Sequence, residues 1–306
     1  MQLVPYVRML LRDMGWVEPY GSRALGTFTR DSDYDLSLIL HEEDDTEDAA
    51  YILEGVMYAL KRGGVGIITV WPNAKTPLVR CTYRHETFDV TLWSSGGVLC
   101  TWLLEEVIET NPEMLDVIRT LKQWAKVHDL LGANQGKLSS HGLTVFAIHY
   151  LVSVGMLGLA HLDGDPSGRS HYALFEQDEM DYYARNGIHD ENLWWVSPAR
   201  RPYSRHVPSF KFLVRGVLHR LFEALSCEPG QGQVYSITTR AREPQPTKAF
   251  LYIEDPISRG NIASNLRFKA REKLSHRLAN ALIFLSDHKT AATTITEPGY
   301  YSRYCQ

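Results

Sequence analysis

The 306-residue sequence has few cysteines, no long apolar run and no excess of positive charge, and each absence excludes a class of protein. The four cysteines show no C-x-x-C pairing, which argues against a zinc site and suggests a reducing compartment. Because no apolar run reaches about 18 residues, we expect no membrane span. No targeting segment is visible at the N-terminus. The net charge of −4 means that any RNA-binding surface must be a local basic patch.

The stretch from Tyr20 to Leu36 combines a Gly-Ser turn with two aspartates one residue apart. The turn Gly21-Ser22 offers backbone N–H groups and a hydroxyl, which can hold a phosphate. Asp33 and Asp35 open the apolar run 36–40, which predicts a strand, and strand residues two apart point to the same face. Two carboxylates that close are unfavourable unless a cation lies between them. Hard divalent cations such as Mg²⁺ prefer these oxygen ligands.

Asp89 supplies a third carboxylate on a further predicted strand, residues 87–92, where it lies on the side opposite Phe88 and Val90. Two-metal phosphoryl transfer needs several carboxylates that converge on the metals. We therefore predict that Asp33, Asp35 and Asp89 are both the catalytic residues and the ligands of two Mg²⁺ ions, with Mn²⁺ as the alternative metal.

Hydrophobic periodicity predicts the surrounding elements. Helices are expected at 4–15, 48–62, 101–109, 112–128 and 140–154, further strands at 66–71 and 77–83, and a linker at Ser94–Gly97.

The Gly21-Ser22 turn followed by Asp33 and Asp35 resembles the signature of the DNA polymerase β nucleotidyltransferase superfamily. Leu121–Lys126, Gly136–Leu143 and Ile253–Pro256 are similar to the terminal uridylyltransferases and noncanonical poly(A) polymerases. The compact size is similar to the trypanosomal uridylyltransferases, in particular those associated with a mitochondrial editosome-like complex. The resemblance covers about residues 15–154 and 249–287.

The resemblance implies an α+β fold with a nucleotide-binding cleft between two domains. A mixed-sheet, polymerase β-like catalytic domain would span residues 1–96. A mostly helical domain of the poly(A)-polymerase-associated type would span 97–306, with an insertion at about 155–210 that packs back toward the catalytic domain.

The resemblance also implies a set of nucleotide-binding residues. Lys122 and Lys126 lie four apart, on one helix face, from which they would reach the β- and γ-phosphates. Ser140 would bind phosphate at a helix start. His141 replaces the family's base-stacking tyrosine and can still stack, with less area. The full set is Gly21, Ser22, Ser32, Gly97, Thr101, Lys122, Lys126, Ser140 and His141.

Base recognition is expected at Asp255, with Arg80 near O2 or O4 of uracil. Related uridylyltransferases have Asp-Pro-x-Glu, where two acids organise a water against uracil N3–H. Here the sequence is Asp255-Pro256-Ile257-Ser258, so one acid is missing. A single acceptor opposite N3–H still favours uracil, because cytosine has no proton there.

Positive charge concentrates in two segments that could follow RNA phosphates. Arg200, Arg201 and Arg205 begin the first, which continues to Arg220, and Arg267–Arg277 forms the second. Solvated helix faces are an equal alternative.

Together these features predict an RNA uridylyltransferase that adds UMP from UTP to the 3′ end of single-stranded or guide-type RNA and releases pyrophosphate. The alternatives are a poly(A) polymerase, a nucleotidyltransferase acting on a small molecule or protein, and an inactive scaffold of an RNA-processing complex. The expected partners are UTP, RNA and an RNA-editing or RNA-processing complex, with no membrane. The resemblance implies a mitochondrial location, with the cytoplasm as the alternative.

Overall fold

The computed structural model describes residues 2–30, 32–40, 48–74, 76–92, 94–161, 195–197, 208–238, 249–287 and 291–297. The chain divides into two compact units, Met1–Leu104 and Glu105–Gln306. The division falls inside helix α4 (Ser95–Glu109), which begins within the segment that we expected to be a linker.

The first unit is built on a five-stranded mixed sheet with the strand order β1-β2-β5-β4-β3. β2 and β5 run parallel, and the other neighbouring strands run antiparallel. This sheet with its helices confirms the predicted α+β class. The strands are β1 (Gly15–Tyr20), β2 (Tyr34–Leu40), β3 (Gly66–Trp71), β4 (Leu78–Tyr83) and β5 (Glu86–Leu92), and the helices are α1 (Leu3–Leu11), α2 (Gly21–Ala24), α3 (Ala49–Arg62) and the start of α4.

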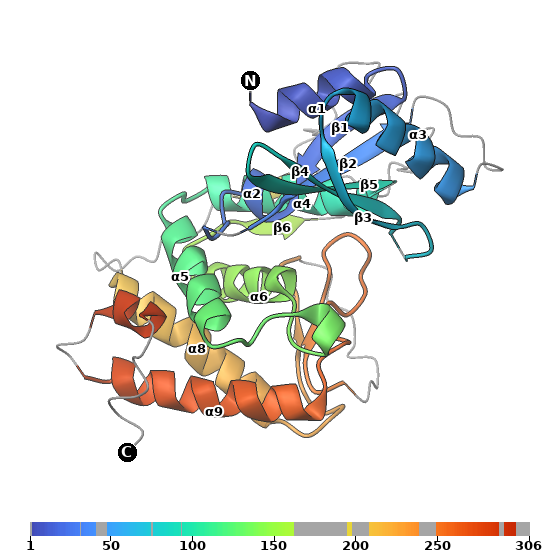
Figure 1. The fold of residues 1–306 in the computed structure, drawn as a ribbon. Coiled ribbons are helices and arrows are strands. Elements are labelled where there is room, and N and C mark those ends of the chain that lie inside the picture. Colours follow the sequence, from blue (N-terminus) through green and yellow to red (C-terminus); the bar gives the residue numbers. More distant parts are fainter. Residues whose placement is uncertain are drawn as a thin grey trace. The chain divides into compact units, whose positions relative to one another are not determined.

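Helices α1 and α3 cover one face of this sheet (Figure 1). Each turns a buried stripe toward it, with Val7 and Leu11 on α1 and Leu53 on α3. Leu36 and Val90 of the central strands belong to the same core. Burying one side chain of this size contributes about 1.5–3 kcal/mol. The core therefore fixes which residues of each strand face inward, and it leaves the alternate residues to the other face.

The periodic segments formed as predicted, but the first strand was missed. The expected strand at 66–71 is β3, and the expected helix at 48–62 is α3 to within one residue. The first helix ends at Leu11 instead of continuing to Gly15, where β1 begins. β1 approaches its neighbour closely, since a Cβ atom on Gly15 would lie 2.1 Å from the carbonyl oxygen of Ile39.

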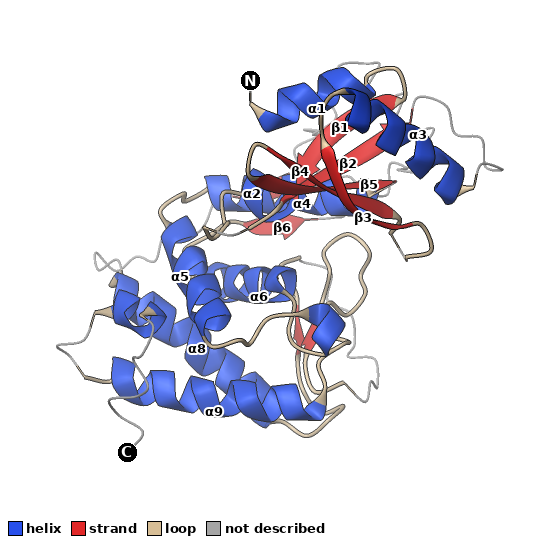
Figure 2. Ribbon diagram, viewed as in Figure 1, coloured by secondary structure: helices blue, strands red, loops and turns tan. Residues whose placement is uncertain are grey.

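The second unit is mostly helical, as predicted (Figure 2). α8 packs against α5, α6 and α9. α6 and α8 approach closely at Gly216, where a Cβ atom would lie 1.9 Å from the Tyr150 hydroxyl oxygen. The elements are α5 (Met114–Val127), η1 (Ala133–Gln135), α6 (Ser140–Ser153), β6 (Leu159–His161), β7 (Trp195–Ser197), α8 (Phe210–Ser226), β8 (Val234–Tyr235), β9 (Tyr252–Ile253), α9 (Phe268–Leu285) and η4 (Ala292–Thr296).

Most of the expected insertion at about 155–210 lies outside the described residues. The predicted RNA-binding residues Arg200, Arg201 and Arg205 lie outside them too. Within the described part, the short strands β6 and β7 pair antiparallel. Among the described helices, none combines the length and the apolar character needed to cross a membrane.

Candidate active site

Four polar side chains form a row across the sheet of the first unit. Tyr20 on β1 pairs with Asp35 on β2, Asp35 pairs with Asp89 on β5, and Asp89 pairs with Arg80 on β4. Directly paired residues project from the same face of a sheet. We call this face the polar face. It lies opposite the face covered by α1 and α3, because the strand neighbours of these residues belong to the core.

The three predicted catalytic aspartates are brought together on the polar face. Asp35 is the second residue of β2, and Asp33 immediately precedes that strand. The side chain of Asp89 is 11% exposed and that of Asp33 is 40% exposed. Because Asp35 and Asp89 leave directly opposed backbone positions on one face, their like charges need a cation between or beside them. Three carboxylates are also the oxygen donor set that Mg²⁺ or Mn²⁺ prefers.

Arg80 provides a positive charge to this cluster. Its Nε and Nη2 atoms donate to the two carboxylate oxygens of Asp89, each at 2.8 Å, and Nη2 lies 3.5 Å from Oδ2 of Asp33. Such a bidentate pair fixes the plane of the carboxylate. Hydrogen bonding to Asp89 raises the pKa of Arg80, so the guanidinium stays charged. Arg80 thus lies on the carboxylates, and its contact with uracil stays a prediction.

Gly21 shapes the turn between β1 and α2. Its φ of +73° is in the left-handed region that favours glycine. A Cβ atom here would also lie 2.7 Å from Oδ2 of Asp35. The N–H of Gly21 donates to Oγ1 of Thr101 at 2.9 Å, so this group is already engaged. The predicted phosphate contact of the turn therefore rests on Ser22.

Thr101 supports this turn from inside α4. It is 3% exposed, and its hydroxyl accepts from Gly21 and donates to the carbonyl oxygen of Gly97 at 2.8 Å. Gly97 lies close to Tyr20, since a Cβ atom at this glycine would be 3.0 Å from the ring. Both residues thus have structural tasks at the turn, and their predicted contacts with the nucleotide stay predictions.

Ser32 orders the loop that leads into β2. Its Oγ accepts from the N–H of Thr29 at 2.9 Å, and its carbonyl oxygen accepts from Nε of Arg23 at the same distance. The Arg23 guanidinium lies 4.3 Å from the ring centroid of Tyr34, the residue that separates Asp33 from Asp35. Sequence reasoning did not single out Arg23, although it lies within the signature stretch. A nucleotide contact of Ser32 stays a prediction.

Tyr20 is a further site residue that sequence reasoning missed. Its hydroxyl lies 3.2 Å from Oγ1 of Thr91, two residues beyond Asp89 on β5. Burial, reinforced by the charges of Asp35 and Asp89, raises the pKa of Tyr20. The alternation of residues 15–20 could have revealed the strand and with it this side chain, but a proline inside the run argues against a strand.

In the second unit, the two lysines that were predicted to bind phosphate lie on α5 in different environments. Lys122 is 3% exposed, whereas Lys126 is exposed. A lysine is almost never fully buried without a compensating partner. Lys122 is therefore not an ordinary surface lysine of α5, and its contact with phosphate stays a prediction.

Ser140 is the first residue of α6, and its side chain is exposed. The preceding residue, Ser139, caps the helix, because its Oγ accepts from the N–H of Gly142 at 2.8 Å. Capping by Ser139 leaves Ser140 to face solvent at a helix start, where anions are favoured. This arrangement is compatible with the predicted phosphate contact.

His141 and Asp255, which were predicted to contact the base, lie close together in the second unit. Nε2 of His141 lies 3.6 Å from Oδ2 of Asp255. Oδ1 of Asp255 accepts from the N–H groups of Ile257 and Ser258 at 3.0 and 2.8 Å. Burial alone would raise the pKa of Asp255, but hydrogen bonds from His141 and the backbone outweigh it and lower the pKa. The carboxylate is thus held ionised as an acceptor.

A buried ion pair that the sequence did not reveal lies beside Asp255. Nε of Arg259 is 3.1 Å from Oε1 of Glu254, and the two side chains are 10% and 2% exposed. Arg259 also donates through Nη1 to Oγ1 of Thr238 at 2.6 Å and has a left-handed φ of +61°. The ion pair joins the two ends of the loop 254–259 to each other, and the hydrogen bond to Thr238 connects this loop to another segment of the second unit.

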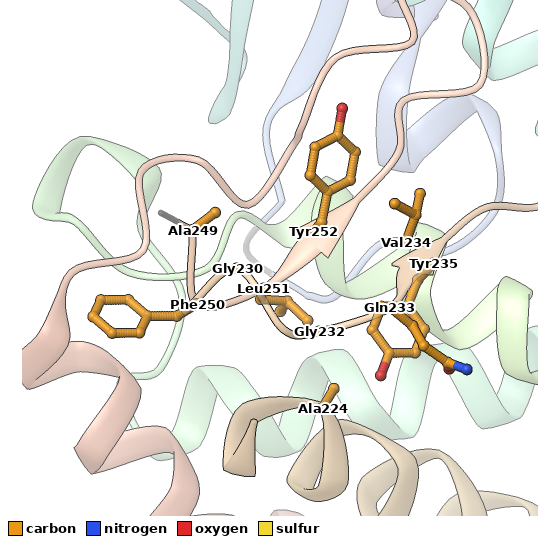
Figure 3. A pocket seen from close by; sticks show the side chains of 10 residues that line it. All are labelled: Ala224, Gly230, Gly232, Gln233, Val234, Tyr235, Ala249, Phe250, Leu251 and Tyr252. Atoms are coloured by element: carbon orange, nitrogen blue, oxygen red, sulfur yellow. The ribbon is translucent and has the colours of Figure 1, made fainter. Parts of the chain in front are cut away.

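A shallow pocket in the second unit lies between the end of α8 and the strands β8 and β9 (Figure 3). No carboxylate, imidazole or amine lines it. Its lining residues are Ala224, Gly230, Gly232, Gln233, Val234, Tyr235, Ala249, Phe250, Leu251 and Tyr252. The three aspartates of the polar face do not line this pocket.

The first unit and the fold of the chain are similar to those of known proteins. Residues 2–105 match the family "Poly(A) RNA polymerase, mitochondrial-like, central palm domain". The poly(A) RNA polymerase GLD2 of Danio rerio is 30% identical over 135 residues, which are 43% of this chain and 28% of that protein. Protein HESO1 of Arabidopsis thaliana is 23% identical over 142 residues, 44% of this chain and 28% of that protein. The chain thus spans under a third of the length of these relatives.

Among solved structures, a mutant of the Cid1 poly(U) polymerase bound to MgATP has a TM-score of 0.70 at 18% identity. The match covers 96% of this chain and 90% of that one. The chain therefore has the fold of the Cid1 poly(U) polymerase, and residues 2–105 are similar to the central palm domain of the matched family.

Proposed function

We propose that this protein is a terminal RNA nucleotidyltransferase that adds UMP from UTP to the 3′-hydroxyl of single-stranded or guide-type RNA. The observation that carries the proposal is the convergence of Asp33, Asp35 and Asp89 on the polar face of a palm domain. The relatives supply the reaction class, since they are poly(A) and poly(U) polymerases by name.

The carboxylates fit a divalent metal by their chemistry. Asp33, Asp35 and Asp89 would hold two Mg²⁺ ions, and Mn²⁺ has the same ligand preference. When bound, the metal lowers the pKa of the acceptor hydroxyl and neutralises the charge of the phosphates. Arg80 offsets part of the acidic charge from the side of Asp89.

Asp89, whose carboxylate is oriented by Arg80, would take the proton of the RNA 3′-hydroxyl. The hydroxyl oxygen then bonds to the α-phosphorus of UTP, the bond to the β-phosphate oxygen breaks, and pyrophosphate leaves. Ser22 lies on the other side of Asp35, at the turn, and would hold the departing phosphates. Most of the catalytic effect comes from positioning and charge stabilisation.

Uracil selection is proposed for the loop of Asp255. Its ionised carboxylate is an acceptor suited to uracil N3–H, and His141 beside it would stack on the base. Lys122, Lys126 and Ser140 of the same unit would contact the triphosphate. Ser258 donates its N–H to Asp255 and brings no second acid, so a poly(A) polymerase is the alternative that this loop keeps open.

The biological setting is proposed from the family that the first unit matches. The family matched by residues 2–105 is described as mitochondrial-like, and we propose a mitochondrial location and a partner complex in RNA editing or processing. A cytoplasmic protein is the alternative. Fractionation of cells that carry the tagged full-length protein decides between the two.

The test is extension of a labelled single-stranded RNA with Mg²⁺ and each ribonucleotide separately, with Asp33→Ala as the inactive control. Extension with UTP alone, lost in Asp33→Ala, is the expected result. Extension mainly with ATP would keep the reaction class and overturn uracil selection. Full activity of Asp33→Ala would overturn the site. No extension, together with no metal-dependent binding of UTP, would favour the scaffold alternative.

A further inference from the structure

Trp71 is an exposed aromatic residue on the polar face, beside Arg80. It ends the edge strand β3 and is 40% exposed. Thr69, two residues earlier on β3, pairs with Arg80 and therefore projects from the polar face. Because strand residues two apart point to the same face, Trp71 projects from it as well. The ring centroid of Trp71 lies 5.7 Å from Cζ of Arg80. One guanidinium thus links the indole to Asp89.

The order of the strands shows on which side of the aspartates Trp71 lies. The turn that would hold the departing phosphates, Gly21-Ser22, follows β1 at one edge of the sheet. Next come Asp35 on β2 and Asp89 on β5, then Arg80 on β4 and Trp71 on β3. In phosphoryl transfer the attacking and leaving oxygens lie roughly in line. If pyrophosphate leaves toward β1, the RNA hydroxyl must approach from the side of β4 and β3.

We propose that Trp71, with Arg80 beside it, is the platform on which the 3′-terminal base of the acceptor RNA stacks. This inference rests on the proposed function and assigns the acceptor side of that site. An indole face accepts any base, because every base has a π-face and no base edge is read. The Arg80 charge would at the same time attract the RNA backbone. The platform thus selects a single-stranded end without selecting its sequence.

The chain offers a matched control. Trp16 lies on β1, the opposite edge strand of the same sheet, and is 41% exposed. Its exposure is nearly the same as the 40% of Trp71, but β1 lies on the opposite side of Asp35 and Asp89. Trp16→Ala therefore removes an equally exposed indole without touching the acceptor side.

The experiment measures extension kinetics and base stacking in the full chain. The substrates are a short RNA and the same RNA ending in a 3′-deoxy-2-aminopurine nucleotide, which cannot be extended and whose fluorescence is quenched by stacking. For Trp71→Ala we expect KM for the RNA to rise about tenfold, with KM for UTP unchanged and the quench lost. Trp71→Phe should retain part of the affinity for RNA and part of the fluorescence quench, and Trp16→Ala should behave as wild type.

An unchanged KM for RNA together with an intact quench in Trp71→Ala would overturn the proposal. Equal losses in Trp71→Ala and Trp16→Ala would overturn it as well, because they would show a general effect of exposed tryptophans. If the wild type extends no RNA, the proposed function fails, and the quench still decides about Trp71. Its loss in Trp71→Ala alone would support the platform, and its persistence would overturn it.

Discussion

Replacing Gly21 by alanine tests whether the turn keeps Asp35 in place. The change has two costs that the structure separates. The left-handed φ of +73° costs an alanine about 1 kcal/mol wherever it occurs. The added Cβ atom would also lie 2.7 Å from Oδ2 of Asp35, whereas ordinary contacts begin near 3.4 Å. The carboxylate must therefore move by several tenths of an ångström.

Gly64 provides the matched control. It has the same φ of +73°, and a Cβ atom there would have no neighbour within 4 Å. Gly64→Ala therefore carries the backbone cost alone. We expect Gly64→Ala to lower Tm by about 4–8 °C, which corresponds to about 1 kcal/mol in a unit of this size, and Gly21→Ala to lower Tm by at least as much.

Only Gly21→Ala should impair catalysis. Metal ligands tolerate shifts of about 0.2 Å, and a misplacement near 1 Å costs about 100-fold in rate. We therefore expect kcat of Gly21→Ala to fall by one to two orders of magnitude, with a weaker affinity for Mn²⁺, and kcat of Gly64→Ala to remain that of the wild type. The assay is RNA extension at saturating UTP, with Mn²⁺ titrated by electron paramagnetic resonance. Equal activity of the two variants at equal Tm would refute the reasoning.

Three further changes have defined outcomes. Arg80→Gln should bind Mn²⁺ more tightly than the wild type, because it removes the cation that pairs with Asp89, but its kcat should be lower. Arg84→Gln is the control, and weaker Mn²⁺ binding by Arg80→Gln would contradict the prediction. Thr101→Val leaves the Gly21 N–H without its acceptor and should cost about 1–3 kcal/mol, measured by thermal unfolding. Hydrogen bonds from Lys137 and Lys273 lower the pKa of Asp129 from 3.8 to about 2, so its stabilisation is present above pH 4 and lost toward pH 2. Asp129→Asn should accordingly lower Tm slightly at pH 7 and not at pH 2.

The residues of the signature could be predicted because their spacing is local. Asp33 and Asp35 are two residues apart, and the strand that follows them is apolar, so one short stretch contains both the ligands and their direction. The position of Asp89 could be predicted from the alternation of apolar and polar residues in its own strand. The parallel pairing of β2 with β5, which sets Asp35 opposite Asp89, is a contact between distant segments, and only the structure shows it.

The contacts that could not be predicted are those in which a side chain has a partner far along the chain. The bidentate contact of Arg80 with Asp89 could not be predicted, because the sequence around Arg80 gives no hint that β4 pairs with β5. Tyr20 was missed along with its strand. Thr101 lies 80 residues from Gly21, and the sequence alone does not reveal the hydrogen bond between them. Glu254 and Arg259 are close in sequence, but their burial depends on the core of the second unit.

The register between β2 and β5 makes the chemistry of this sheet depend on its hydrophobic pattern. Sliding one strand by a single residue would turn Asp89 into the core and bring Val90 to the polar face. Such a slip would expose the apolar side chains of a whole strand. The free energy gained by burying them therefore opposes the slip and keeps Asp35 opposite Asp89. A one-residue insertion in β5 should thus be as damaging as loss of an aspartate. The alignment of the proposed metal ligands therefore depends on core residues that do not belong to the site.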